Sequence, residues 1–250
     1  MKETTMETAT DIDPITFAVV KSGLDSIVDE MAHTVVRTAR SEIVKDVMDF
    51  SAALCAADGQ MVAQAKTIAL HLGAVPDAIQ AVLAKFDGDL GEGDVIIMND
   101  PYVGGMHLPD IFMFMPIFHE GRRCAFAVVI CHHTDVGGRA PGSNASDSTE
   151  IFQEGLRVPP VKLFIGGRRN DTLFDMIAQN VRVPDRVIGD IGAQVAACKV
   201  GERELGRLLD QYGVDKVQRY MTELLDYAER LTLAEIGKWP EGEYSFTDYI

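Results

Sequence analysis

Imidazole and carboxylate groups stand close together in NDPYVGGMHLPD, residues 99–110. His107 precedes Asp110 by three residues, and the surrounding glycines and prolines disfavour a regular helix there. With a second imidazole these groups would supply three protein ligands, the set that leaves an open position on Zn²⁺, Mn²⁺ or Fe²⁺. A histidine and an aspartate at this spacing are common by chance, so the second imidazole decides whether the pattern predicts a metal site.

A second imidazole comes close if residues 111–135 form a hairpin. IFMFMPIFHEGRRCAFAVVICHHTD has two apolar runs on either side of an EG dipeptide, which is typical of two strands joined by a turn. Antiparallel pairing about that turn would bring His132 beside Asp110, because the two residues are almost equally far from it. Successive strand residues point to opposite faces, so only one of His132 and His133 can reach the site.

Four further residues could support this site. Asp46 and Asp49, in KDVMDFS, follow the first predicted helix. They are interpreted as a helix-end pair with a structural role, although they could add a fourth ligand. Asp135 follows the histidine pair and could orient a ligand imidazole through its second nitrogen. His71, in HLGAVP, is either a turn residue or a substrate contact.

Other catalytic arrangements are absent or weak. The sequence has no GxxxxGK[ST] phosphate loop, no GxGxxG after a strand and no GxSxG elbow. Ser143, Ser146 and Ser148 lie in a loop without an evident base. Cys131 precedes His132, but adjacent strand residues point apart, which argues against a thiolate pair. The sequence therefore predicts neither a serine or cysteine nucleophile nor a nucleotide site of its own.

The composition is that of an ordinary globular protein of 250 residues, with 47% hydrophobic and 24% charged residues. A formal net charge of −15 without a basic patch disfavours nucleic-acid binding. We expect no secretory signal, and no apolar run reaches the length of a membrane span. The four cysteines lie in apolar segments without a CxxC pair, which predicts reduced, buried thiols and a cytoplasmic protein.

The patterning predicts an α+β fold in which long helices cover a mixed, mainly antiparallel sheet. We expect a flexible N-terminus over residues 1–12 and a single domain over residues 13–250. The last residues, GEYSFTDYI, alternate like a half-buried strand and stop without a turn, so we expect the N-terminal part of a larger chain. Helices are predicted at 14–40, 77–86, 172–180, 184–209 and 214–236, a hairpin at 49–64 around Asp58-Gly59, and a strand that delivers Asn99 and Asp100.

The sequence resembles the hydantoinase B/oxoprolinase family over nearly its whole length. The resemblance is carried by DPITFAVVKSGLDSIVDEM, KDVMDFSAAL, HLGAVPDAI, GDVIIMNDPYVGGMHLPD, CHHTDVGG, STEIFQEGLRVPPVKL and NVRVPDRVIGDIGAQVAA. Members include N-methylhydantoinase B subunits, the C-terminal half of 5-oxoprolinase, caprolactamase, and the large subunits of acetone and acetophenone carboxylases. Family members are typically about twice as long, which again suggests a longer protein.

The resemblance implies a site for Zn²⁺ or Mn²⁺ with Asp46, His107, Asp110 and His132 as ligands. Asp46 stands where the family usually has glutamate, and an arginine usually follows it. The remaining roles that we predict in this framework are catalytic for Asp100, His133 and Asp135, and substrate-binding for His71, Gly104, Gly105 and Glu150.

The implied function is ATP-dependent ring opening of a cyclic amide such as a hydantoin, a lactam or 5-oxoproline. A hydantoinase A-type partner, as a separate subunit or a fused domain, would handle ATP and Mg²⁺, which agrees with the missing phosphate loop. One alternative is the large subunit of an ATP-dependent ketone carboxylase. A second alternative is a non-catalytic assembly subunit with a structural metal. The residues do not separate these alternatives.

Overall fold

The protein is built around one antiparallel sheet. The computed structural model describes residues 12–86 and 88–249. Every strand pairing in this part of the chain is antiparallel, in the order β2-β1-β5-β4-β3-β6-β7. The strands are β1 (Phe50–Ala56), β2 (Met61–Gln64), β3 (Val95–Met98), β4 (Asp110–His119), β5 (Arg122–His132), β6 (Val161–Ile165) and β7 (Arg168–Arg169).

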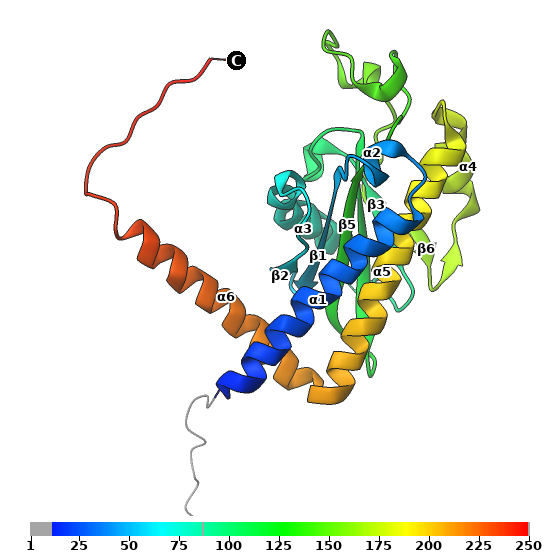
Figure 1. Cartoon of the computed structure of the whole chain (residues 1–250). Helices are drawn as coiled ribbons and strands as arrows, with labels where there is room; N and C mark the ends of the chain where they lie inside the picture. Colours follow the sequence, from blue (N-terminus) through cyan, green and yellow to red (C-terminus); the bar gives the residue numbers. More distant parts are fainter. Residues whose placement is uncertain (1–11, 87, 250) are drawn as a thin grey trace, which may run out of the picture.

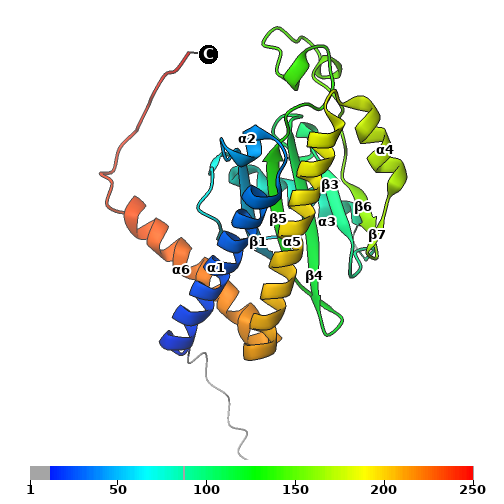
Figure 2. The same ribbon diagram turned by 45° about the vertical axis from the view of Figure 1, so that its right-hand side comes forward.

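Helices cover both faces of the sheet, so the predicted α+β class is confirmed. In Figures 1 and 2, α1 and α5 lie side by side across one face, with α3 on the other. The α-helices are α1 (Pro14–Thr38), α2 (Glu42–Lys45), α3 (Val75–Phe86), α4 (Asp171–Asn180), α5 (Pro184–Tyr212) and α6 (Val214–Ile236). Short 3₁₀ turns are η1 (Leu70–Ala74), η2 (Pro101–Val103), η3 (Pro141–Ser143) and η4 (Ile151–Gln153).

The long N-terminal helix starts where its sequence predicts. The Asp13 side chain caps α1 by accepting a hydrogen bond from the backbone N–H of Thr16 at 2.9 Å, and Pro14 takes the first helical position. Helical spacing then places Val20, Leu24 and Val28 on one buried stripe against the sheet and α5. Packing of this stripe fixes the helix over β1 and β2, beside α5.

Two apolar cores lie on the two faces of the sheet. The larger one joins α1, α4, α5 and one side of every long strand. The smaller one joins α3, η1 and the opposite strand face, where Phe112, Phe114 and Ile130 are buried. Because side chains alternate along a strand, even-numbered residues of β4 up to residue 117 and of β5 from residue 125 face α3, and odd-numbered ones face α5. The alternation therefore decides whether a side chain at the end of β4 or β5 lies on the α3 face or on the α5 face of the sheet.

The central hairpin has the register that the sequence predicts. Glu120 and Gly121 turn it with positive φ angles of 50° and 75°. Ten cross-strand pairs follow, from His119↔Arg122 at the tip to Asp110↔His132 at the open end. The ladder irregularity between Ile117 and Phe118 compensates for the offset of the turn.

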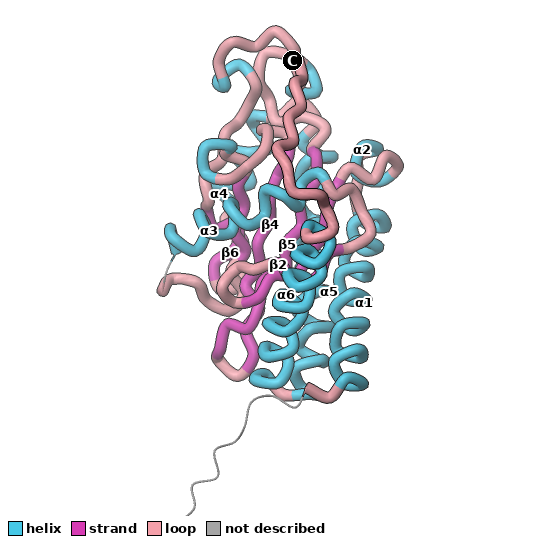
Figure 3. The backbone as a smooth tube through the Cα atoms, turned by 90° about the vertical axis from the view of Figure 1, so that its left-hand side faces the viewer, coloured by secondary structure: helices cyan, strands magenta, loops and turns pink. Residues whose placement is uncertain are grey.

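The C-terminal segment differs from its prediction. Residues 240–249 form no strand and are exposed, so the strand predicted for GEYSFTDYI is wrong. Alternation alone does not make a strand, because a strand needs a neighbour for its backbone hydrogen bonds. Figure 1 shows this segment running away from the molecule beyond α6. The helix α6 contacts α1 and α5 through its first half and then diverges from them, so that it points toward the viewer in Figure 3.

Three further predictions concern the N-terminus, the cysteines and the membrane-spanning character of the helices. The predicted flexible residues lie almost wholly outside the described part, because residues 1–11 are not described. All four cysteines are free and buried, as predicted, and burial raises the pKa of the Cys55 thiol to about 12. Among the helices that the structure describes, none combines the length and apolar character needed to cross a membrane.

Candidate metal centre

Three strand ends meet at one rim of the sheet. Asp110 begins β4 and His132 ends β5, and the two residues are direct cross-strand partners. On the other side of β5, Phe50 pairs with Cys131, and the backbone N–H of His132 donates to the carbonyl of Asp49 at 3.0 Å. The sheet register therefore places Asp49, Asp110 and His132 next to one another.

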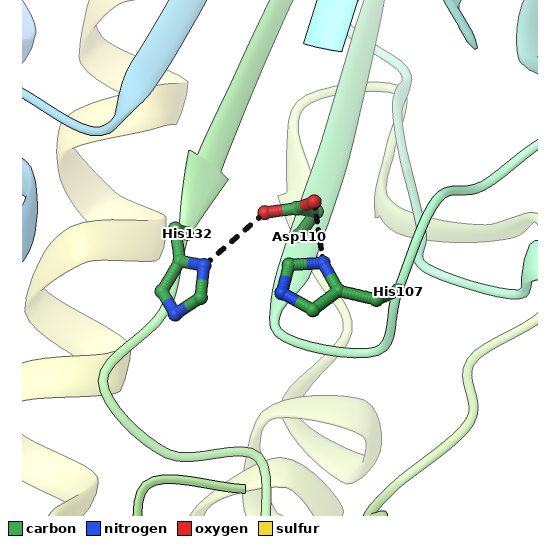
Figure 4. A group of neighbouring side chains, drawn as sticks. All are labelled: His107, Asp110 and His132. Carbon is green, nitrogen blue, oxygen red and sulfur yellow. Dashed lines mark hydrogen bonds and ion pairs between the residues drawn. The ribbon is translucent and has the colours of Figure 1, made fainter. Parts of the chain in front are cut away.

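The loop before β4 brings His107 to the same place (Figure 4). The candidate ligand atoms of His107, Asp110 and His132 all lie within 4.8 Å of one another. His107 Nδ1 is 2.5 Å from Asp110 Oδ2, and His132 Nδ1 is 3.5 Å from Asp110 Oδ1. The two imidazoles thus approach the two different oxygens of one carboxylate.

Two residues outside this trio complete the surroundings. Asp49 Oδ2 lies 3.8 Å from His132 Nδ1. His71, in the 3₁₀ turn η1, places its Nε2 3.5 Å from Asp49 Oδ1 and 3.4 Å from Asp110 Oδ1. His71 is buried, whereas the side chain of His107 is 42% exposed. These five residues, Asp49, His71, His107, Asp110 and His132, form one cluster. The cluster is closed on the side of His71 and open to solvent on the side of His107.

The neighbouring imidazoles favour the ionised form of the Asp110 carboxyl group. Burial alone would raise the pKa of Asp110, but the imidazoles of His107, His132 and His71 outweigh it and hold that pKa well below its usual range. The bond to Asp110 raises the pKa of His107, against the opposing effect of partial burial. Asp110 is thus a permanent buried carboxylate at neutral pH.

The donor set fits a divalent cation. Asp110 Oδ1 is buried without a hydrogen-bond partner of good geometry, although two imidazole nitrogens lie 3.4–3.5 Å away. An orphaned carboxylate oxygen is costly in a protein interior unless a cation or water satisfies it. Imidazole nitrogens with carboxylate oxygens are ligands that suit Zn²⁺ and Mn²⁺.

Three residues with predicted roles lie apart from this group. Asp46 is exposed and caps the C-terminus of α2, so the carboxylate beside the imidazoles is that of Asp49. His133 points to the opposite face, where its Nε2 is 3.0 Å from Gln194 Oε1, and burial lowers its pKa. The Asp135 carboxylate accepts hydrogen bonds from Arg182 and from two glycine N–H groups, which anchors the following loop.

The predicted catalytic residue Asp100 and the predicted substrate-binding residues Gly104, Gly105 and Glu150 lie on loops at the same rim. Asp100 caps η2 by accepting from the N–H of Tyr102 at 3.0 Å. Gly104 has φ of 97° and packs so tightly on α3 that a Cβ would lie 2.5 Å from the nitrogen of Ala78. Gly105 is similarly confined by the carbonyls of Asn99 and Asp100. Glu150 is exposed at the start of η4.

Sequence reasoning missed the residues that hold this rim in place. The Asn99 side chain donates to the carbonyls of Leu108 and Leu156 and accepts from the N–H of Val158 at 2.6 Å. Its position directly after a buried strand was the available signal. Asp190 Oδ1, on α5, accepts from the N–H groups of Arg40 and Ser41 and fixes the turn between α1 and α2. Nothing local in the sequence distinguishes that aspartate from a surface residue.

Relatives share most of this chain. The beta subunit of caprolactamase from Pseudomonas jessenii is 41% identical over 236 residues, which cover 94% of this chain and 41% of that protein. A putative D-/L-hydantoinase B subunit from Pseudomonas sp. (strain NS671) is 33% identical over 244 residues, 96% of this chain and 41% of that protein. The chain thus spans less than half the length of these relatives.

A solved structure and a family model agree with these matches. The crystal structure of ATP-dependent caprolactamase from Pseudomonas jessenii superposes with a TM-score of 0.87 and 38% identity, over 93% of this chain and 40% of that chain. The sequence model of the hydantoinase B/oxoprolinase family matches residues 13–250, which include the sheet and all five residues of the cluster at its rim. Since that match takes in nearly the whole sequence, the chain belongs to the hydantoinase B/oxoprolinase family.

Proposed function

We propose that the chain holds a divalent cation, Zn²⁺ or Mn²⁺, through Asp49, His107, Asp110 and His132. The observation that carries this proposal is the convergence of two imidazoles and two carboxylates from separate segments on one rim of the sheet. The resemblance alone assigned the fourth ligand to Asp46. The proposal assigns it to Asp49 because that carboxylate faces His132, whereas Asp46 is exposed beyond the end of α2.

The proposed reaction is the ATP-dependent hydrolytic opening of a cyclic amide. Two of the relatives are named for a lactam and for hydantoins, and the caprolactamase is described as ATP-dependent. For this chain the candidate substrates are hydantoins, lactams and 5-oxoproline. Because the sequence has no phosphate loop, the proposal places ATP and Mg²⁺ on a hydantoinase A-type partner in a hetero-oligomer.

The proposal gives each residue of the rim a role that fits the exposure of its side chain. A bound divalent cation would supply Lewis acidity at the amide carbonyl. Asp110, buried and ionised, provides the fixed negative charge and keeps His107 oriented through the bond to its Nδ1. His107 borders the solvent, so the substrate would approach from its side. Asp100, on the loop that carries His107, is the proposed acceptor of the proton that the attacking water loses.

The test replaces His107, the most exposed of the proposed ligands. The purified chain is expected to bind one Zn²⁺ or Mn²⁺, and His107→Ala is expected to lose that binding and all turnover when assayed with the ATP-binding partner. Metal analysis and ATP hydrolysis against a panel of cyclic amides measure both. Wild-type turnover by a cation-free His107→Ala protein would contradict the proposal.

The same assay separates the alternatives. ATP turnover that requires bicarbonate and a ketone, with no response to cyclic amides, would select the carboxylase. Loss of folding together with loss of the cation, and no turnover with any substrate, would select a structural metal in an assembly subunit.

A further inference from the structure

Asp190 is a buried residue of α5 that binds the backbone of a different segment. Its Oδ1 accepts hydrogen bonds from the backbone N–H groups of Arg40 at 2.6 Å and of Ser41 at 3.1 Å. Its Oδ2 is buried without a hydrogen-bond partner among the residues that the structure describes. The two bonds of Oδ1 therefore offset the burial of this group, and they join α5 to the turn between α1 and α2. Because both donors are backbone N–H groups, either charge state of the carboxyl group can accept these bonds.

A glycine makes room for this contact. Gly189 precedes Asp190 on α5, and a Cβ at its position would lie 2.2 Å from Cγ and 3.0 Å from Cβ of Arg40. The base of the Arg40 side chain thus lies directly against the helix, which keeps its backbone within reach of Asp190. Gly192, about one turn further along α5, has no described atom within 4 Å of such a Cβ.

The short helix α2 connects this anchor to Asp49. Ser41 is the N-cap residue of α2, and the carbonyl of Ile43 in that helix accepts from the backbone N–H of Asp49 at 3.0 Å. Met48, directly before Asp49, has a left-handed φ of 60°, a strained conformation for methionine. A helix of four residues does not hold its own shape in water, so the path of the chain into β1 depends on the contacts that fix α2.

We propose that Asp190 is a positioning residue that fixes α2 and thereby holds the Asp49 carboxylate beside His132 for a shared cation. This inference rests on the proposed function, in which Asp49 is a ligand. The N–H of Asp49 binds α2, and its carbonyl accepts from the N–H of His132 at 3.0 Å, so the Asp49 backbone links α2 to β5. Groups that orient metal ligands typically change metal affinity by about 10- to 100-fold when they are removed. Since Asp190 acts through α2, we expect the lower end of this range.

The experiment measures the Zn²⁺ affinity of the full chain by competition with a chromophoric chelator. Asp190→Leu removes the acceptor and is expected to weaken binding by about tenfold. Asp190→Asn keeps an acceptor oxygen without the charge, so it should retain most of the affinity. The control is Asp94→Leu, which also removes an acceptor of two backbone N–H bonds, but at the end of β3 opposite to the rim. It should bind Zn²⁺ like the wild type.

Gly189→Ala tests the same contact without altering Asp190. The added methyl group would push Arg40 away from α5, so the Zn²⁺ affinity should fall as it does in Asp190→Leu. Gly192→Ala is the matched control and should keep wild-type affinity, because its methyl group meets open space. This pair decides the outcome if Asp190→Leu does not fold, since wild-type affinity in both alanine variants would overturn the proposal.

A double-mutant cycle shows whether Asp190 acts through Asp49. In an Asp49→Asn background that ligand is already lost, so the addition of Asp190→Leu should cause no further loss of Zn²⁺ affinity. Additive losses would overturn the proposal, as would wild-type affinity in Asp190→Leu or an equally large loss in Asp190→Asn. If the wild type binds no Zn²⁺, or if Asp49→Asn binds it as tightly as the wild type, the proposed function itself fails and this inference falls with it.

Discussion

At the scale of single residues, the centre depends on which carboxylate faces the imidazoles. Asp46 and Asp49 are three residues apart in KDVMDFS, but only Asp49 lies at the start of a strand beside His132. Asp46 is a helix cap in solvent. Because the two residues are chemically identical, a comparison of their variants tests the effect of position alone.

We expect Asp49→Asn to weaken Zn²⁺ binding strongly and Asp46→Asn to leave it unchanged. Removal of a charged ligand should reduce affinity by at least about tenfold, because the neutral amide loses both charge and ligand strength. Isothermal titration of both variants with Zn²⁺ checks this. A loss in Asp46→Asn without a loss in Asp49→Asn would favour the assignment that the resemblance gave.

The sequence predicted part of this centre because part of it is local. His132 could be placed beside Asp110 since both belong to one hairpin, whose register follows from its turn. Asp49 and His71 come from other segments, and their approach depends on the pairing of β1 with β5 and on packing of η1 against the sheet. No local pattern reports such pairings, so His71 could be interpreted only as a turn residue or a substrate contact.

At the scale of elements, α5 ties the helical layer to the site strands. Gln194 is fully buried, and its Nε2 donates to the carbonyls of Ile111 and Val129, while its Oε1 contacts His133. Ile111, directly after Asp110, and Val129, three residues before His132, are thus held by one side chain. Such a contact fixes both strand ends relative to the helix.

Gln194→Leu should therefore destabilise the fold. The buried partners lose hydrogen bonds, which typically costs about 1–3 kcal/mol in the free energy of unfolding. Urea denaturation followed by circular dichroism measures the change. Gln211→Leu, on the exposed face of the same helix, is the control and should lie within about 0.5 kcal/mol of the wild type.

The hairpin of β6 and β7 is anchored to β3 by a buried ion pair with a predictable pH dependence. Asp94 accepts from the N–H groups of Gly91 and Gly166 and contacts Lys162 Nζ at 2.9 Å. Burial opposes ionisation, but these bonds prevail and lower the pKa of Asp94 below its usual value of 3.8. A lowered pKa means that the stabilisation is complete above pH 3.8 and is lost as the pH falls through the folded-state value.

We expect Asp94→Asn to lower the free energy of unfolding by about 1.5–3 kcal/mol at neutral pH. The difference from the wild type should stay constant from about pH 8 to about pH 5 and shrink below the usual carboxyl pKa. Urea unfolding of both proteins along this pH series tests the sign. A difference that grows on acidification would contradict the assignment.

At the scale of the whole molecule, α6 stands apart from the rest. Its first half is buried through Val217, Tyr220 and Met221, whereas its second half leaves the body of the molecule (Figure 1). Leu231 and Leu233 are 51% and 59% exposed. Apolar side chains in solvent contribute little to folding, because their environment changes little when the chain folds.

Leu231→Glu and Leu233→Glu together should leave the melting temperature of the isolated chain unchanged. In contrast, Leu205→Ala, at a fully buried position of α5, should cost about 2–5 kcal/mol through the cavity it leaves. Thermal unfolding by circular dichroism compares the two proteins. A large fall in the melting temperature of the glutamate variant would mean that this half of α6 packs against something in solution.

The pairing of Asp110 with His132 at the mouth of the hairpin also limits how length can vary there. A single residue added to β5 between the tip and the rim would rotate His132 toward α5 and bring His133 or Cys131 to the α3 side. Two residues added to β5 would return His132 to the α3 side but shift it by two residues along the strand. Only the tip itself can change length freely, so tolerance to insertion should fall stepwise from tip to mouth.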